Sequence, residues 1–282
     1  MGTATIVPFL GPSLKEEHSP VLFSAIAASC LGKKIAAVTK VSEGKERLLE
    51  PLKAKGIDVM ARPGELGEIR VKLPSLNLDE RQAFVVKDGD TLAIDDMPPF
   101  EPCLVHLCCF GPAKHQLDLM RVLKTRGFGL SVDVQGFVLQ PDVKTGEVRL
   151  QDVPEKKEIL TLADFVKLDA MEAQTLTGAG ALQDQAAILE DWGSSETVIT
   201  CAEGVLARSK GASTLLKLIN GSFRGRMGRG DTVIGSYLAR RLDHSVEDSL
   251  RFAVALTSIK LHKAGPFRGS VEDVLTKMQQ VE

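Results

Sequence analysis

The sequence predicts a three-layer α/β/α fold, with helices on both faces of a mostly parallel central sheet and a small additional β-sheet. The first observation is that the segments of residues 4–61 alternate strand, helix and strand. Such alternation needs crossover connections, which place helices on the faces of a parallel sheet. The second is a break in this order at residues 62–96, where polar and apolar residues alternate, as in half-exposed antiparallel strands. With 282 residues, the chain can bury a large core.

Composition narrows the class of protein. Hydrophobic residues make up 44% and charged residues 26% of the chain, as in ordinary globular proteins. A net charge of −2 argues against a nucleic-acid binder that works by bulk electrostatics. The sequence lacks both the ~20-residue apolar run that spans a bilayer and the basic start of a signal peptide, so we expect no membrane partner. The 5 cysteines include no Cys-x-x-Cys pair, which favours buried thiols in a reducing, cytoplasmic compartment.

The N-terminal elements follow from short apolar runs and helical spacing. A proline suits the first turn of a helix, and a glycine commonly follows its end. We expect strands at residues 4–10, 35–41 and 57–61, and helices at residues 20–31 and 45–55, the first of them between Pro20 and Gly32.

Residues 62–96 read as a small antiparallel sheet inserted into this body. Residues 68–73 alternate polar and apolar, and the segments 82–86 and 91–94 flank a turn signal at residues 87–90. A surface hairpin without a role is the alternative. Exposed strand edges favour pairing with another chain, so the segment also predicts a possible homodimer.

The remaining chain returns to the α/β order. We expect strands at residues 103–108, 128–134, 164–168 and 197–201. Two further strands are expected within residues 205–218, around a turn at Lys210 and Gly211. Helices are expected after Glu172 and at residues 114–125, 183–192, 233–242, 246–263 and 271–278. In such folds ligands bind at the carboxyl ends of the strands. Polar residues fall at or near these ends, namely Asp133, Asp169, Thr200 and Asp231.

The stretch of residues 224–242 contains the strongest motif. Glycine and arginine fill its first half, and its second half has apolar residues at helical spacing. Gly228 and Gly230 allow close approach of the backbone to a ligand, and a helix start binds anions. Arg229 adds a cation, and Asp231 is either an ordinary helix cap or a carboxylate placed beside an anion site.

Gly228-Arg-Gly-Asp-Thr232 resembles the Gly-Ala-Gly-Asp-Thr signature of the PfkB carbohydrate kinases, the ribokinase-like family. The resemblance implies a single ribokinase-like domain over residues 1–282, with residues 62–96 as a lid over the acceptor. It also implies that the backbone of residues 228–231 forms an anion hole and that Asp231 is the general base of phosphoryl transfer from ATP.

Further segments resemble other elements of this family. Asp169 and Glu172 match its Asn-x-x-Glu element, with Asp in place of Asn, and imply a magnesium ion held largely through water. Thr200 and Gly204 resemble the element beside ATP, although Ala202 stands where glycine is usual. The helix that carries Ala255 and Ser258 resembles the one against adenine. An equally good alternative for that helix is that small residues let it pack close to the sheet.

The acceptor end matches the family least. Asp133 and Gln135 resemble its Asp-x-Gln-Gly element below the transferring phosphate, and Glu16 has the offset from Gly11 of an acidic residue that grips a substrate hydroxyl. The family's early Gly-Gly pair and Asn are missing from residues 18–24. The resemblance allows a sugar, a cyclitol or a nucleoside as the acceptor. The alternative is a ribokinase-fold protein that binds a nucleotide or metabolite without catalysis.

Overall fold

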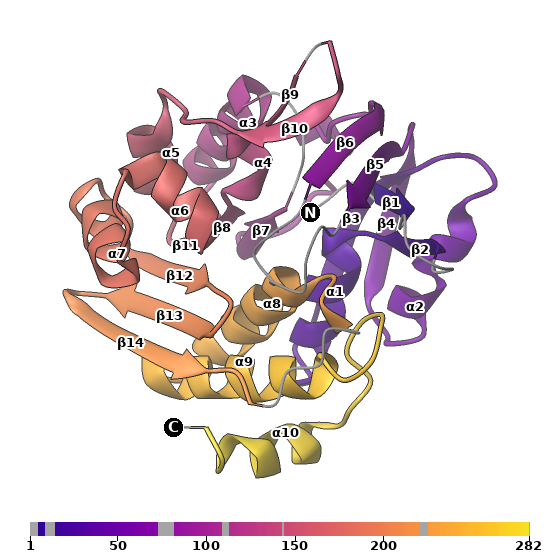
Figure 1. Ribbon diagram of the computed structural model, residues 1–282. Coiled ribbons are helices and arrows are strands. Elements are labelled where there is room, and N and C mark those ends of the chain that lie inside the picture. The colour runs from indigo at the N-terminus through magenta and orange to yellow at the C-terminus, as the bar shows by residue number, and fades with distance from the viewer. Residues whose placement is uncertain are drawn as a thin grey trace.

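The computed structural model describes residues 5–8, 15–72, 82–108, 113–142, 144–219 and 225–281. Its main sheet has six strands (Figure 1), and the parallel strands among them are β7, β8, β11 and β12. In spatial order the strands are β14 (Ala212–Lys217), β13 (Gly204–Ser209), β12 (Glu196–Thr200), β11 (Phe165–Asp169), β8 (Gly129–Asp133) and β7 (Leu104–Leu107). The predicted hairpin is confirmed, because β13 and β14 pair antiparallel through a turn at Lys210 and Gly211 with φ angles of 51° and 78°. Positive φ at both positions suits the twist of a tight hairpin.

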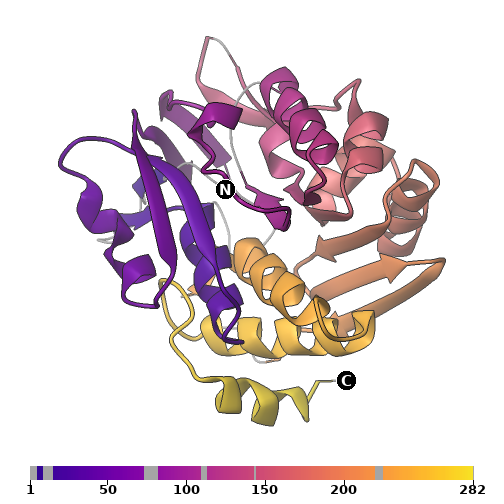
Figure 2. The ribbon, with the colours of Figure 1, turned by 180° about the vertical axis from the view of Figure 1, so that it is seen from behind.

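Helices cover both faces of this sheet, as Figures 1 and 2 show, which confirms the α/β class. One side carries α1 (Pro20–Ser29), α8 (Arg229–Arg241), α9 (Val246–Lys260) and, packed on α9, α10 (Val271–Met278). The other side carries α3 (Ala113–Thr125), α4 (Gln135–Val138), α5 (Lys156–Leu162), α6 (Ala170–Thr177) and α7 (Leu182–Asp191). None of the described helices has the length and apolar character needed to cross a bilayer.

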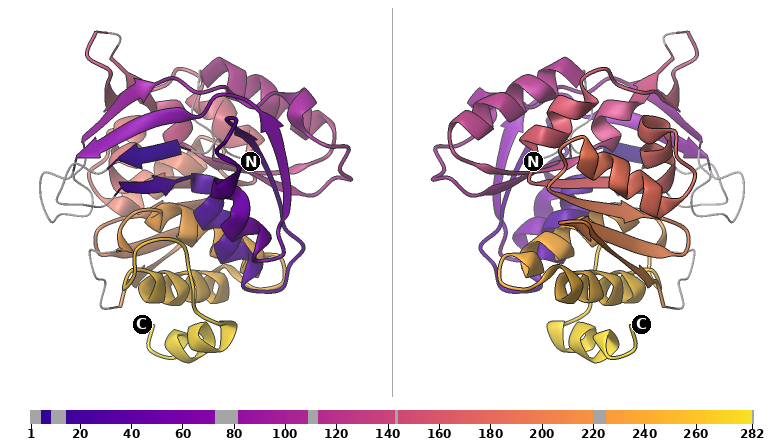
Figure 3. Two further views of the ribbon diagram at one scale, coloured as in Figure 1. Left: turned by 90° about the vertical axis from the view of Figure 1, so that its right-hand side faces the viewer. Right: turned by 90° about the vertical axis from the view of Figure 1, so that its left-hand side faces the viewer.

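A second six-stranded sheet lies beside the main one (Figure 3). Its spatial order is β2 (Lys15–His18), β1 (Thr5–Pro8), β5 (Gly67–Lys72), β6 (Gln82–Lys87), β10 (Glu147–Leu150) and β9 (Leu139–Pro141). The antiparallel pair β5–β6 agrees with the predicted sheet, while residues 73–81 of that segment lie outside the described residues. The sheet is larger than expected, because β1 and β2 from the N-terminal segment and β9 and β10 from residues 139–150 join this pair.

Two predictions for the N-terminal third were wrong in detail. The sequence predicts a strand at residues 4–10 as the first strand of the central body, but β1 pairs with β2 and β5 in the second sheet. Residues 4 and 9–10 lie outside the described residues. A four-residue strand carries too little pattern to reveal its partners. Residues 91–94 form no strand, and a 3-10 turn, η2 (Ile94–Asp96), begins at the last of them. There the Asp96 carboxylate accepts a hydrogen bond from the Ala93 N–H at 2.8 Å.

The strands expected at residues 35–41 and 57–61 are present, but they pair only with each other among the described strands. They are β3 (Ala36–Val41) and β4 (Asp58–Pro63), a parallel two-stranded sheet. The helix expected between them is split into a 3-10 turn, η1 (Glu46–Leu49), and a single helical turn, α2 (Glu50–Lys53). Pro51 lies at the start of α2, where a missing N–H and fixed φ are tolerated.

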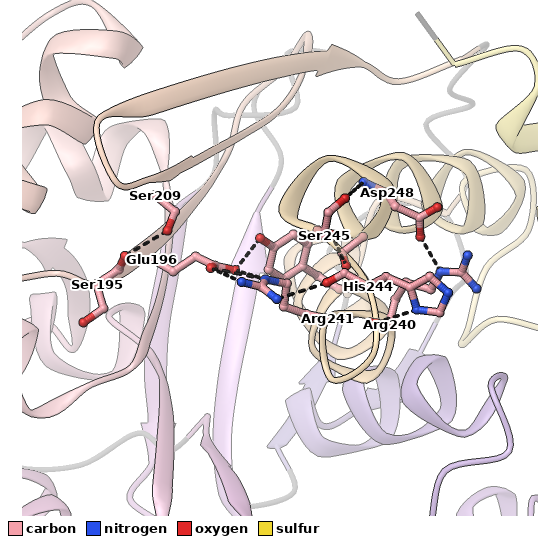
Figure 4. A network of polar contacts seen from close by, with 10 residues as sticks. Ser195, Glu196, Ser209, Arg240, Arg241, His244, Ser245 and Asp248 are labelled. Carbon is pink, nitrogen blue, oxygen red and sulfur yellow. Dashed lines mark hydrogen bonds and ion pairs between the residues drawn. The ribbon is translucent and has the colours of Figure 1, made fainter.

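A buried polar network fixes α8 against the main sheet. The Tyr237 hydroxyl donates a hydrogen bond to the Glu196 carboxylate at 2.5 Å, and the Arg241 guanidinium binds the same carboxylate. Figure 4 shows Arg241 of α8 directed at Glu196, the first residue of β12. Burial and the Glu196 charge raise the pKa of Tyr237 far above its usual value, so the hydroxyl keeps its proton. The network holds the helix that begins beside the candidate site.

Candidate functional site

Three neighbouring strands of the main sheet end in polar residues at one edge. Asp133 ends β8, Asp169 ends β11 and Thr200 ends β12. The pairing places Lys167 opposite Asp133, and Asp169 opposite Thr200. The expectation that these side chains share one end of the sheet is confirmed, and helix α8 begins at the same place.

Lys167, which was not among the predicted site residues, lies at the centre of this group. Its Nζ lies 3.0 Å from Oδ2 of Asp133, with both side chains only 5% exposed. Burial alone would lower the pKa of Lys167, but nearby carboxylates raise it well above its usual value, so the ammonium stays charged. In order of effect, these carboxylates belong to Asp133, Glu172, Asp231 and Asp169. A lysine within the buried strand β11 was the signal in the sequence, because buried charges are rare unless they are paired.

The first turn of α8 lies against this ammonium. A side chain on Gly230 would place its Cβ 2.8 Å from Cε and 2.9 Å from Nζ of Lys167, so only glycine permits the observed approach. Gly228 precedes the helix with φ 71°, and a Cβ there would lie 2.2 Å from the ring of Phe23. The first N–H groups of a helix carry partial positive charge. The helix start and the Lys167 ammonium therefore place positive charge side by side, an arrangement that suits an anion.

Asp231 and Arg229 both lie in the first turn of α8, and each has a different neighbour. Asp231 is half-buried and close enough to Lys167 to raise its pKa. Arg229 is 8% exposed, and its Nη1 donates a hydrogen bond to the Cys201 carbonyl at 2.9 Å, just beyond the end of β12. The first turn of α8 thus carries a carboxylate near the Lys167 ammonium and a guanidinium bonded to the backbone beyond β12.

Asp169 and Glu172 cap α6 reciprocally. Oδ1 of Asp169 accepts a hydrogen bond from the Glu172 N–H at 2.8 Å, and Oε2 of Glu172 accepts one from the Asp169 N–H at 2.7 Å. Among the described residues, no group of three or more His, Cys, Asp or Glu side chains is arranged to hold a metal ion directly. Two adjacent carboxylates still fit Mg²⁺, because this ion often takes only one or two protein carboxylates and keeps several waters.

The residues expected to contact a nucleotide are packed into the protein. Thr200 is 1% exposed, and its hydroxyl lies 3.4 Å from the Leu168 carbonyl. A Cβ on Gly204 would lie 2.1 Å from the Leu216 carbonyl oxygen, so the packing of β14 alone requires glycine there. Ala255 and Ser258 are fully buried, and the Ser258 hydroxyl accepts a hydrogen bond from the Ile219 N–H at 2.9 Å. These contacts agree with the alternative given for this helix, in which small residues let it pack close to the sheet.

The residues expected at the acceptor lie on different elements. Asp133 is buried, and its Oδ1 accepts a hydrogen bond from the N–H of half-buried Gln135 at 3.0 Å. The backbone of Glu16 pairs with Val7 in the second sheet; Gly11, from which its offset was counted, lies outside the described residues. The structure brings Asp133, Asp169, Glu172 and Asp231 together around Lys167.

Comparison with known proteins agrees with this arrangement. The family model described as pfkB family carbohydrate kinase matches residues 24–272. The ribokinase of Haemophilus influenzae is 27% identical over 132 residues, which span 44% of this chain and 42% of that protein. The chain therefore aligns with less than half the length of this relative.

Solved structures match over nearly the whole chain. A pyrophosphate-dependent kinase in the ribokinase family, complexed with a pyrophosphate analog and myo-inositol, is 26% identical with a TM-score of 0.87, covering 98% of both chains. The Arabidopsis thaliana ribokinase, complexed with ribose and ATP, has a TM-score of 0.70 at 16% identity, covering 99% of this chain and 97% of its own. This second likeness concerns the fold alone. The fold, the helix start with its Gly-x-Gly-Asp motif and the family match together show that the chain belongs to the pfkB family of carbohydrate kinases.

Proposed function

We propose that this protein transfers the terminal phosphoryl group of a donor to a hydroxyl of a small polyhydroxylated acceptor, with Asp231 as general base. One observation carries the proposal: the Lys167 ammonium and the first turn of α8 meet at Gly230, one residue before Asp231. Fixed positive charge for phosphoryl oxygens thus lies beside a carboxylate that can accept a proton. Phosphoryl transfer depends mainly on such positioning and charge stabilisation.

In the proposed step the acceptor oxygen forms a bond to phosphorus as the bond to the leaving oxygen of the donor breaks. The hydroxyl proton passes to Asp231, and the leaving group departs with the bonding electrons. The N–H groups at the start of α8 and the Lys167 ammonium stabilise the negative charge on the transferring group. Asp133 keeps Lys167 in place through their 3.0 Å ion pair.

ATP with Mg²⁺ is the donor complex that the sequence motifs favour. Asp169 and Glu172 lie next to Lys167 at the end of β11 and would hold Mg²⁺ largely through water. The ion would neutralise part of the charge on the donor phosphates. Thr200 and Gly204 border the end of β12, where the donor chain would leave the anion site.

Pyrophosphate is a second candidate donor. Two observations favour it. Ala255 and Ser258, which were expected to face adenine, are fully buried, and a pyrophosphate-dependent kinase covers 98% of this chain with a TM-score of 0.87. The Arg229 guanidinium at the end of β12 would then bind the departing phosphate, because arginine pairs well with phosphate oxygens.

The proposed acceptors are sugars, cyclitols and nucleosides, and the relative solved with myo-inositol puts cyclitols first in the test. The second sheet, with β5 and β6, would cover the acceptor as a lid. The rival function is binding of a nucleotide or metabolite without turnover, because the family's Gly-Gly pair and Asn are missing from residues 18–24.

Phosphorus NMR on a panel of acceptors tests the proposal. Each acceptor is incubated with either ATP or pyrophosphate and Mg²⁺, so that a new phosphate-ester signal reports transfer from either donor. We expect an ester signal for at least one acceptor, and one that grows at least ~10²-fold more slowly with the Asp231→Asn variant. Tight ligand binding without an ester signal on any acceptor would leave only the binding function.

A further inference from the structure

We infer that Lys260, the last residue of α9, is a positioning residue whose buried ammonium fixes the loop of residues 225–228 and thereby the anion site at the start of α8. The inference rests on the proposed function and adds to it a residue from a separate helix. Lys260 is 3% exposed although it carries a charge. Such burial needs a strong compensating interaction, and the loop before α8 provides it.

The Lys260 ammonium donates hydrogen bonds to two carbonyl oxygens of this loop, those of Gly225 and Met227. It also lies 4.8 Å from the centroid of the Phe23 ring, a favourable position for a cation over an aromatic face. The two acceptors belong to the residues directly before and directly after Arg226. One ammonium therefore constrains the backbone on both sides of that residue.

Further contacts at both ends of the loop of residues 225–228 restrict its conformation. The Gly225 N–H donates to the Leu261 carbonyl at 3.0 Å, and a Cβ on Gly225 would lie 2.6 Å from the Lys260 and Lys263 carbonyl oxygens. At the other end, Gly228 is packed against the Phe23 ring. Phe23 thus contacts both the ammonium and the last residue of the loop.

This loop leads directly into the anion site. The Arg229 N–H donates to the Arg226 carbonyl at 3.2 Å, and the Thr232 N–H donates to the Gly228 carbonyl at 2.9 Å. The direction of the first α8 N–H groups therefore depends on the loop conformation. Without the ammonium, the buried Gly225 carbonyl and the part-buried Met227 carbonyl would lose this donor, and a buried acceptor without a partner is costly. We expect the loop to rearrange and the anion site to lose its alignment.

Anion binding and kinetics on Lys260→Ala test the inference. Calorimetry with inorganic phosphate and with pyrophosphate measures the anion site without requiring turnover. We expect at least ~10-fold weaker anion binding, the size that loss of charged hydrogen bonds commonly causes. We also expect a higher KM for the donor and an unchanged KM for the acceptor.

Two further experiments distinguish a positioning role of the Lys260 ammonium from a role in packing alone. Propylammonium, which replaces the missing side chain, should restore anion binding and turnover to Lys260→Ala, whereas tetramethylammonium, a cation without N–H groups, should not. Lys260→Met keeps the length and packing of the side chain, so it serves if the alanine variant does not fold. Lys156→Ala is the matched control, because its ammonium donates to the Leu176 carbonyl at 2.7 Å but lies on α5, on the other face of the main sheet.

The outcomes are distinct. Variants with lowered melting temperature but wild-type anion affinity and donor KM would overturn the inference, because Lys260 would then serve packing alone. Weakened anion binding in a protein that phosphorylates no acceptor would support the inference while rejecting the proposed function. A wild-type protein that binds neither phosphate nor pyrophosphate would overturn both.

Discussion

The Lys167 ammonium lies 3.0 Å from the Asp133 carboxylate, and each side chain is 5% exposed. A buried ion pair often contributes no more stability than apolar residues of the same size. Its position against Gly230 offers a functional reason for its presence, since the ammonium forms half of the proposed anion site. The pair links β8 and β11 to the first turn of α8.

Replacing Lys167 separates stability from function. Lys167→Met leaves Asp133 buried without its partner, which typically costs ~3–5 kcal/mol, and it removes charge from the anion site. The double variant Lys167→Met with Asp133→Asn should regain most of the free energy of unfolding, measured by urea denaturation, yet remain inactive. A double variant that is both stable and active would show that the ammonium has no role in transfer.

Gly230→Ala and Gly228→Ala should fail in different ways. At Gly230 the added Cβ meets only the flexible end of Lys167, so the melting temperature should stay near wild type while phosphate affinity falls. At Gly228 the positive φ of 71° costs alanine ~1–2 kcal/mol, and the Phe23 ring 2.2 Å away adds to this. Thermal melting and phosphate titration of both variants check the contrast. Equal phosphate affinity in Gly230→Ala and wild type would contradict the proposed anion site.

His106 should make the fold sensitive to acid. Burial and the Lys167 charge lower the pKa of His106 from 6.5 to about 3, and its Nδ1 lies 3.0 Å from the Ser131 hydroxyl oxygen. Between these two pH values the unfolded chain binds the additional proton, so the free energy of unfolding falls as the pH drops from 6.5 towards 3. Above pH 6.5 the imidazole is neutral in both the folded and the unfolded chain, so this loss of stability is absent.

The variant His106→Asn should flatten the pH dependence of the free energy of unfolding in that window, measured by denaturant titration at several pH values. His115→Asn, at an exposed position on α3, is the control. An unchanged slope in His106→Asn would mean that this imidazole does not determine the acid sensitivity.

Local patterns in the sequence were sufficient for most elements of the main sheet. The runs that became β7, β8, β11 and β12 were recognisable as short apolar segments, and the polar residues at the ends of two of them led to Asp133 and Asp169. The glycine-rich start of α8 was recognisable because its motif is continuous in sequence. These features depend on residues that are close together along the chain.

Features that depend on distant contacts were not predictable in this way. The strand β1 joins the second sheet through β5, about sixty residues later, and nothing within its four residues encodes that choice. Lys167 and Lys260 bind partners 34 and 35 residues away along the chain, so their roles emerge only when the helices and strands are assembled. Position 204 needs glycine because the Leu216 carbonyl of β14 leaves no room for a Cβ there. No local sequence motif predicts this contact.

The kinetics of Asp231→Asn test the central claim most directly, on whichever acceptor the panel identifies. Asparagine caps a helix about as well as aspartate, so the fold should persist, and phosphate or nucleotide binding should survive or tighten slightly. Loss of a general base typically lowers the rate by ~10²–10⁴-fold, and we expect kcat to fall within that range. A folded Asp231→Asn protein that retains more than about a tenth of wild-type activity would contradict the assignment of Asp231 as the base.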